Sequence, residues 1–213
     1  MGLDYRYLLF FERAAELDAL LRLAALSARR GGEAVTLEVP VREAAGVAGA
    51  GGTPSFPYRT LTLPFAAWAG TPAQLWWDDP SPAWEFATVL AFEPDEAIER
   101  YQRDEPQRDE RGRHAIGYIY LTVHRDMAGW ASGVDRDVVL FEFGTTGSRM
   151  SALFSESESI RAAFTGLLRD SRGVCGVLDM EDSAILFWWQ GRELEAELPT
   201  AELDLAEIGR FVP

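Results

Sequence analysis

Segments with the hydrophobic pattern of a strand alternate along this chain with segments that have the pattern of a helix. The order of these segments limits the folds that the chain can adopt. Residues 5–11 are rich in aromatic and aliphatic side chains and predict a strand, whereas 12–30 repeat leucine and alanine at the spacing of a helix. Two more strands are predicted at 34–39 and 58–63. The first part of the chain therefore has the order β-α-β-β.

The same order returns in the second part, where Leu9 and Phe11 align with Leu90 and Phe92. A Trp- and Pro-rich connector, in which the prolines argue against regular central structure, separates the two parts. We interpret the parts as a structural repeat. The predicted elements of the second part are a strand at 84–92, a short helix at 94–103, strands at 115–124 and 137–143, a helix at 155–169 with a capping box from Ser155 to Glu158, strands at 173–179, 184–189 and 192–198, and one or two helical turns near the end.

Residues 84–179 have the order β-α-β-β-α-β, which is the ferredoxin-like arrangement. We therefore predict an α+β protein of tandem β-α-β-β units, with mostly antiparallel sheet and helices on one face. One unit spans 1–70 and the other spans 84–213 with a C-terminal hairpin, and we expect them to pack as one globular body. In element order the chain is similar to the gyrase-inhibitor-like effector-binding domains, and this resemblance implies that it binds a ligand.

The absence of two residue types excludes several enzyme classes. All 20 basic residues are arginines, and the chain has neither lysine nor asparagine. Without lysine it cannot form the internal Schiff base of a pyridoxal phosphate enzyme or a class I aldolase, and it cannot build a Walker A phosphate site or a kinase site. Because both missing residues have A-rich codons, the composition indicates a gene of high GC content, as in a high-GC bacterium.

The net charge of −14 restricts the partners that the protein can bind. Affinity for nucleic acid comes mainly from cationic side chains that displace counterions, so we expect no nucleic-acid binding. An acidic surface favours a cationic small molecule or a basic protein partner, although acidity also serves simple solubility.

The sequence predicts a soluble, cytoplasmic protein without a cofactor or a metal. It has no apolar stretch long enough to span a membrane, and its beginning lacks the basic and apolar regions of a signal peptide. The single cysteine, Cys175, cannot form an internal disulfide, and His114 and His124 show no zinc or triad spacing. We predict no catalytic residue, and the oligomeric state stays open.

The best candidate ligand site combines aromatic side chains with one carboxylate. Alternation along 115–124 sends Tyr118 and Tyr120 to one face of a strand, and Glu142 shares a strand face with apolar residues. Together they suit a cationic or flat molecule, by cation–π attraction and one counter-charge. Trp77 and Trp188 each belong to an adjacent tryptophan pair that must point one ring to each face, so they join this prediction. The simpler alternative is that all five are structural and that Glu142 pairs with an arginine.

Glycine and hydroxyl residues also separate a predicted strand from a helix in the segment GTTGSR, which ends at Arg149. Exposed amides at such a position bind anions, and Gly147, Ser148 and Arg149 are the predicted anion-binding residues. The alternative is a turn followed by caps on two consecutive helices.

These observations predict a non-enzymatic binding protein for a cationic small molecule or a basic protein. An effector-binding protein should enclose an aromatic pocket around Glu142, whereas a toxin-neutralising immunity protein should present a broad acidic face without a pocket. The alternative class is a metal-independent hydrolase or transferase that uses His124 or Glu142 as its base.

Overall fold

The protein is an α+β fold, as the sequence predicts. A computed structural model describes residues 3–26, 35–40, 58–63, 74–76, 83–125, 127, 137–202 and 204–212, with backbone alone for 24, 35–40, 58–63, 74–76 and 83–87. The helices are α1 (Glu16–Leu26), α2 (Glu96–Tyr101), α3 (Ser148–Glu156), α4 (Glu158–Asp170) and α5 (Leu205–Ile208), with 3₁₀ turns at Arg13–Ala15 and Gly209–Phe211. The strands are β1 (Arg6–Glu12), β2 (Val35–Pro40), β3 (Tyr58–Leu63), β4 (Gln74–Trp76), β5 (Ala83–Phe92), β6 (His114–His124), β7 (Val138–Gly144), β8 (Gly173–Asp179), β9 (Ala184–Trp189) and β10 (Arg192–Leu198).

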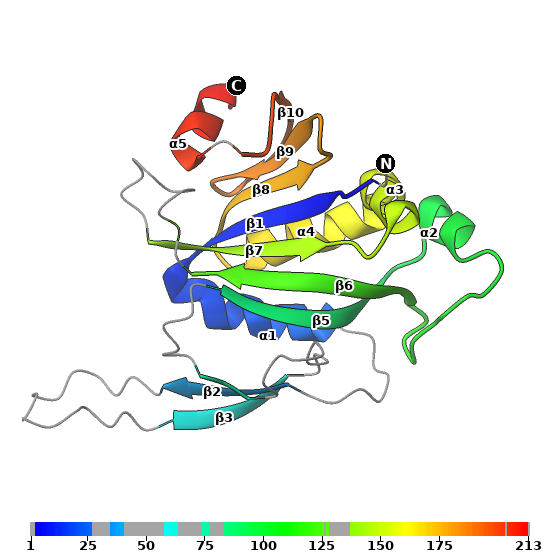
Figure 1. Ribbon diagram of the computed structural model, residues 1–213, viewed down its shortest axis with the longest axis horizontal. Coiled ribbons are helices and arrows are strands. Elements are labelled where there is room, and N and C mark those ends of the chain that lie inside the picture. The colour runs from blue at the N-terminus through cyan, green and yellow to red at the C-terminus, as the bar shows by residue number, and fades with distance from the viewer. Residues whose placement is uncertain are drawn as a thin grey trace, which may run out of the picture.

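Seven of these strands form one antiparallel sheet in the order β10-β9-β8-β1-β7-β6-β5 (Figure 1). The other three form a smaller sheet, in which β2 pairs antiparallel with β3 and parallel with β4. Strand β4 lies inside the Trp- and Pro-rich connector, where the sequence predicts no regular structure. It is short and sits at the edge of its sheet, a place where nearby prolines are tolerated.

Strand β1 occupies the centre of the large sheet. It pairs with β7 on one side and with β8 on the other, and its residues from Tyr7 to Phe11 are all buried. The connection from β7 to β8 therefore passes over β1 through α3 and α4. A strand buried on both faces needs the continuous run of apolar residues that this segment has.

The strand order does not confirm the tandem ferredoxin-like arrangement. Strand β1, from the first predicted unit, is hydrogen-bonded inside the sheet that contains β5 to β8 of the second, whereas β2 and β3 pair with β4 in the small sheet. Element order along the chain does not specify which strands pair, because pairing depends on contacts between distant segments.

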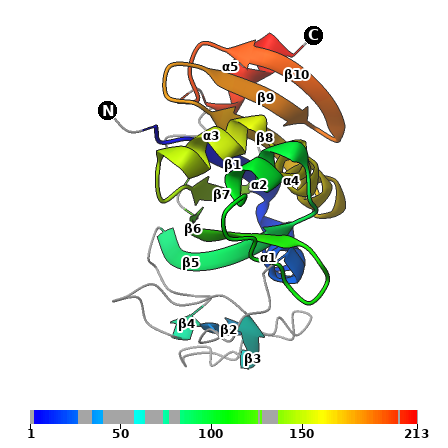
Figure 2. The same cartoon turned by 90° about the vertical axis from the view of Figure 1, so that its right-hand side faces the viewer.

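The two faces of the large sheet carry separate cores. Helices α1 to α4 pack on one face against a cluster that includes Tyr7, Phe143 and Phe164, and Figure 2 shows α1 and α4 side by side there. The opposite face carries a second cluster, to which α5 contributes Leu205 and Ile208. The prediction of helices on one face is therefore right for α1 to α4 and wrong for α5, whose apolar side chains cover the other face of β8 and β9.

The helix predicted over 155–169 begins later than expected, as α4 at Glu158, because residues 155–156 belong to α3 and the cap is Ser157 and not Ser155. Ser157 has an extended backbone conformation that ends α3, and its hydroxyl accepts a hydrogen bond from Ile160 N as the cap of α4. Asp95 caps α2 through Ile98 N and also accepts hydrogen bonds from the Ser157 hydroxyl and Ser159 N. Burial raises the pKa of Asp95, but these hydrogen bonds outweigh it and hold the pKa below its usual value. One carboxylate thus joins the beginnings of two helices.

A buried carboxyl group lies where β1 leads into α1. Glu16 is fully buried, its oxygens have no hydrogen-bond partner among the described residues, and Arg125 Nε lies 3.4 Å from Oε1. Burial raises the pKa of Glu16 to about 7, although Arg125 and Arg13 act to lower it, and Asp137 adds to the rise. The carboxyl group is therefore mostly protonated in the folded state below pH 7.

Glu16→Gln should remove a pH-dependent loss of folding stability. Because the folded pKa of about 7 lies above the ordinary 4.5, the contribution of Glu16 to stability is complete below pH 4.5 and is lost as pH rises through 7. At about pH 8 the loss amounts to roughly 3 kcal/mol. We expect Glu16→Gln to raise the free energy of unfolding at about pH 8 and to change it little at about pH 4, measured by urea denaturation.

The matched control is Glu99→Gln, at an exposed position on α2. It should leave the pH dependence of the unfolding free energy unchanged. If Glu16→Gln and Glu99→Gln show the same dependence, the carboxyl of Glu16 is ionised in the folded protein.

Candidate functional site

The face of the sheet away from α1 to α4 is only partly covered. On β6, the side chains of Ile119, Leu121 and Val123 enter the core under the helices, so the alternating residues face the other way. These are Tyr118, Tyr120, Thr122 and His124, as the alternation of the sequence predicts. Glu142 of β7 lies directly opposite Thr122 and therefore shares this face.

Glu142 is held in an ion network that runs across four strands. Its Oε1 accepts a hydrogen bond from Arg6 Nη1 at 3.0 Å, and its Oε2 lies 2.8 Å from His124 Nε2. Arg6 also donates from Nη2 to Asp179 Oδ2 at 2.6 Å. Arg6 on β1 thus bridges a carboxylate on β7 and another on β8, while His124 extends the network to β6.

These contacts keep Glu142 ionised. The hydrogen bond from His124 lowers the pKa of Glu142, burial opposes this, and the charge and hydrogen bond of Arg6 lower the pKa further, so the net shift is downward. Because an ionised carboxylate can only accept hydrogen bonds, His124 donates from Nε2. The negative charge of Glu142 is therefore balanced by neighbours within the protein.

The structure brings three of the predicted ligand residues to one face. Tyr118 and Tyr120 are 56% and 37% exposed, and Tyr120 lies opposite Gly144, diagonal to Glu142. Trp188 does not join them, because it is buried in the core under the helices and its indole N–H donates to Gly173 O at 2.9 Å. Trp77 lies outside the described residues. Ligand binding by this set stays a prediction.

The predicted anion-binding residues are tied to neighbours within the protein. Gly147 is the N-cap residue of α3, and the Ser148 hydroxyl accepts a hydrogen bond from Leu3 N at 2.9 Å. Arg149 donates to Tyr101 O at 3.1 Å, and its guanidinium carbon lies 5.4 Å from the centre of the Tyr101 ring. Anion binding at this helix start also stays a prediction.

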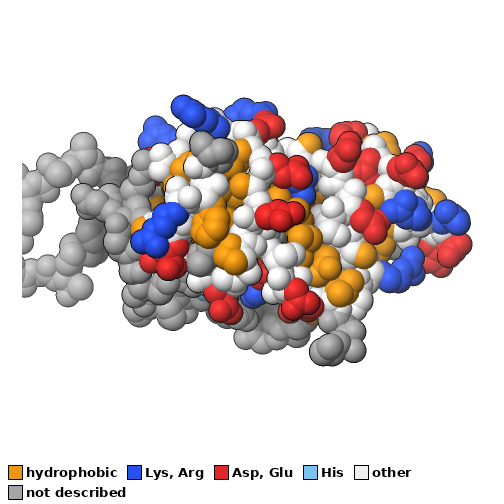
Figure 3. Space-filling view, turned by 90° about the horizontal axis from the view of Figure 1, so that it is seen from above, with side chains coloured by type: hydrophobic (Ala, Val, Ile, Leu, Met, Phe, Trp, Pro, Cys, Tyr) orange, Lys and Arg blue, Asp and Glu red, His pale blue; other side chains and the backbone are white. Residues whose placement is uncertain are grey.

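A groove of about 600 Å³ lies between α4 and the β9–β10 hairpin. Phe187 is the apolar residue that β9 contributes to its lining, whereas charged and hydroxyl side chains form most of the rest. Figure 3 views the molecule from above, where β10 and α5 lie uppermost, and acidic side chains stand among hydrophobic ones on that face. The groove is lined by Ser155, Glu156, Ser157, Glu158, Arg161, Ala162, Thr165, Arg169, Phe187, Glu193, Leu194 and Glu195.

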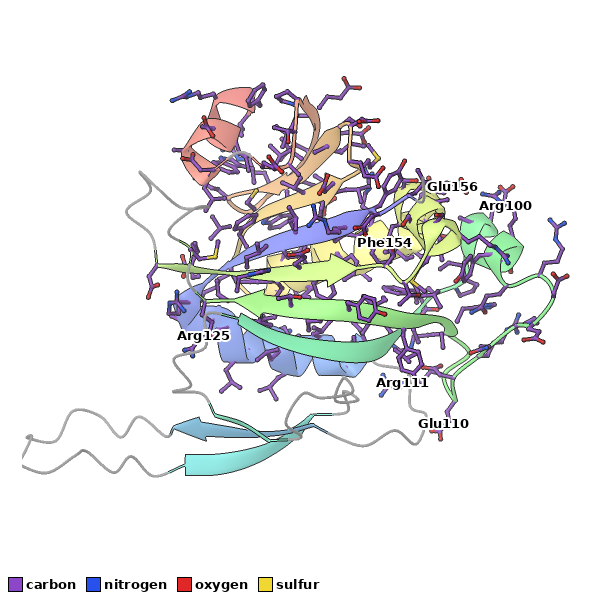
Figure 4. The ribbon with its side chains drawn as sticks, in the orientation of Figure 1. Arg100, Glu110, Arg111, Arg125, Phe154 and Glu156 are labelled. Atoms are coloured by element: carbon purple, nitrogen blue, oxygen red, sulfur yellow. The ribbon has the colours of Figure 1, made fainter. Side chains whose placement is uncertain are left out.

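Ion pairs cross this groove from α4 to β10. Arg169 pairs with Glu193, and Arg161 Nη1 lies 3.5 Å from Glu195 Oε2. At the mouth, Glu156 pairs with Arg100 of α2, and Figure 4 shows these two side chains near each other where α3 and α2 meet. These pairs engage three of the four glutamates in the lining, and Glu158 is left over, so the groove keeps one carboxylate in excess.

Sequence reasoning named Glu142 and His124 but missed Arg6, Asp179 and the groove. Arg6 carried one signal, because it is the charged member of a strand face that otherwise holds Leu8 and Phe10. No sequence pattern indicates the groove, because it exists only once the β9–β10 hairpin has extended the sheet beyond α4.

The described residues give little support for a metal site or a reactive cysteine. No three His, Cys, Asp or Glu side chains gather among them as a metal site would require. Cys175 is fully buried, and burial raises the pKa of its thiol far above the usual value, which leaves it unreactive. Within the same ranges, none of the helices combines the length and the apolar character that crossing a bilayer demands.

No family model matches the chain, and comparison with curated proteins and with solved structures likewise gave no match. The functional conclusion therefore rests on the geometry and charge of the surfaces described above.

Arg6→Gln should destabilise the protein by leaving two carboxylates without their cation. Arg6 is 37% exposed, so we expect a loss smaller than for a fully buried pair, roughly 1–3 kcal/mol near neutral pH. Because the pKa of Glu142 is lowered, its contribution exists above pH 4.5 and disappears as pH falls. The difference from the wild type should therefore shrink at about pH 3, as measured by urea denaturation.

Arg22→Gln provides the control, since Arg22 pairs with Asp18 on the exposed surface of α1. It should cost much less stability than Arg6→Gln, because solvent screens an exposed pair. Equal losses for the two substitutions would show that the Arg6 network contributes nothing beyond an ordinary surface pair.

Proposed function

We propose that this protein is a non-catalytic binding protein that receives a basic segment of a partner protein in the groove between α4 and β10. The observation that carries the proposal is a cavity of about 600 Å³ lined by four glutamates and two arginines. A charge distribution of one sign attracts and orients a partner of the opposite sign.

Seven arginines outside the groove lining are engaged in ion pairs within the protein. Those at positions 6, 13, 22, 100, 113, 125 and 172 each contact a carboxylate. With 34 acidic residues against 20 arginines, one-to-one pairing leaves carboxylates in excess. A net negative charge repels anions, so the chain as a whole favours a cationic partner.

A protein partner fits the groove better than a small molecule does. A small effector is bound best in an enclosed, mostly apolar pocket with few polar groups. The groove instead is open and lined mainly by charged and hydroxyl side chains, and Tyr118 and Tyr120 stand on an exposed sheet face. Glu142, the counter-charge expected for a cationic effector, already binds Arg6.

The charge of the groove can be tested with a defined probe, an acetylated and amidated peptide that alternates arginine and valine. The double variant Glu193→Gln/Glu195→Gln removes the two carboxylates that pair with Arg169 and Arg161. Fluorescence anisotropy of the labelled peptide should show binding roughly tenfold weaker than to the wild type. Affinity of the wild type should fall as salt rises from about 50 to about 200 mM.

The matched control is Glu99→Gln/Glu105→Gln, which makes the same change in net charge at exposed positions on α2 and the loop after it. It should weaken binding by less than about twofold. If both double variants weaken binding equally, the proposal that the peptide binds in the groove is wrong. The weaker binding would then come from the change in overall charge alone.

The pairing of His124 with Glu142 favours a second candidate, hydrolase or transferase activity with His124 as base. If Nε2 carries the proton, Nδ1 of the neutral imidazole has a free lone pair, and the ring is oriented by a carboxylate as in catalytic dyads. On this view, wild-type protein hydrolyses p-nitrophenyl acetate about 100-fold faster than His124→Gln does. Equal rates for the wild type and the variant would eliminate His124 as a base toward this ester.

A further inference from the structure

Strand β10 is the last strand of the seven-stranded sheet. It pairs with β9 on one side, and the described residues place no strand on its other side. Along such an edge, alternate residues direct their backbone N–H and C=O groups outward without a sheet partner. These groups can form main-chain hydrogen bonds with an added strand.

The two faces of β10 differ sharply in chemistry. Glu193, Glu195 and Glu197 are exposed and lie on the side of α4, where Glu193 and Glu195 line the acidic groove. Leu194 and Ala196 are partly buried on the other side, where they pack with Leu198 against the cluster that includes α5. After the exposed Arg192 at its start, the strand alternates acidic and apolar residues from Glu193 to Leu198.

We infer that the basic partner binds by strand addition, as an extended segment that pairs with the outer edge of β10 and alternates cationic and apolar residues. This inference rests on the proposed function and specifies how the partner is held. On the α4 side, arginine or lysine side chains lie next to Glu193, Glu195 and Glu197, and opposite charges on neighbouring strands attract. On the other side, apolar side chains continue the surface formed by Leu194 and Ala196.

The length and shape of β10 define the size of this segment. At about 3.3 Å per residue, the seven residues of β10 extend over roughly 23 Å, which suits a partner segment of about six residues. The pairing with β9 shifts between Glu193 and Ala196, so a bulge twists the strand there. Bulges and charges at an edge discourage indiscriminate pairing, and they leave a cationic strand as the favoured one.

A second copy of this chain is not a suitable occupant of the edge. Pairing β10 with another β10 would place glutamates next to glutamates on one face, and like charges on neighbouring strands repel. The same argument applies to acidic or neutral segments, which gain nothing from the groove. Charge complementarity therefore selects a basic segment from a different protein.

Backbone methylation tests the inference without altering the protein. Two isomers of the arginine–valine peptide carry N-methyl groups either on every arginine amide or on every valine amide, so their charge and composition are identical. In a strand, alternate residues direct their amides to opposite edges, and only one isomer loses the amides that face β10. We expect that isomer to bind at least about tenfold more weakly than the other, measured by anisotropy against wild-type protein.

Hydrogen exchange supplies a second measurement with the unmethylated peptide. Amides of β10 should exchange more slowly in its presence, whereas amides of β5, at the opposite edge of the sheet, should not change.

The outcomes separate this inference from the proposed function. If both methylated isomers bind as the parent peptide does and remain sensitive to Glu193→Gln/Glu195→Gln, strand addition is overturned and the groove stands as an electrostatic site. If the parent peptide shows no saturable binding to the wild type, the proposal that the groove binds a basic segment is wrong, and strand addition is wrong with it. A tenfold difference between the isomers together with protection of β10 supports both.

Discussion

The insertion of β1 between β7 and β8 is the constraint on which the rest of the structure depends. A strand from the beginning of the chain completes a sheet made by later segments, so the crossover through α3 and α4 must pass over it. On the helix side, Tyr7 of this strand donates a hydrogen bond to Phe154 O and packs against the ring of Phe164. On the other side, Arg6 binds carboxylates on both neighbouring strands. The same short strand thus fixes the positions of α3, α4, β7 and β8.

That arrangement also separates structural charges from charges available for binding. In the centre of the open face, Glu142 and Asp179 share the cation of Arg6, and the pairing helps to hold three strands in register. Toward the edge, β10 carries three exposed glutamates, of which Glu193 and Glu195 pair with arginines of α4. Because exposed pairs add little to stability, the acidic side chains at the edge contribute little to folding, which agrees with the partner-binding role proposed for them.

The sequence predicted where strands lie far better than how they pair. The bounds predicted for β3, β8, β9 and β10 agree with the structure, since strong alternation and turn residues mark them locally. The place of β1 was not predictable, because its neighbours β7 and β8 are more than a hundred residues away along the chain. Ser157 shows the same limit on a smaller scale: its extended conformation is supported by Asp95, which belongs to a different helix start. Alternation placed Tyr118, Tyr120 and Glu142 on one face, but the Arg6 contact and the groove depend on that long-range pairing.

An exposed edge strand such as β10 can pair with unwanted chains, and one set of side chains on this strand opposes such pairing. The unpaired backbone groups of β10 attract any extended chain, and identical edges on neighbouring molecules are the most abundant source. Glutamates at 193, 195 and 197 make that self-pairing repulsive, because each strand would bring the same charges to the same face. The same glutamates attract a cationic strand. The residues that protect the edge from a second copy are therefore also the ones proposed to bind a basic partner. At this edge, protection against self-association and the proposed selection of a partner depend on the same electrostatic interaction.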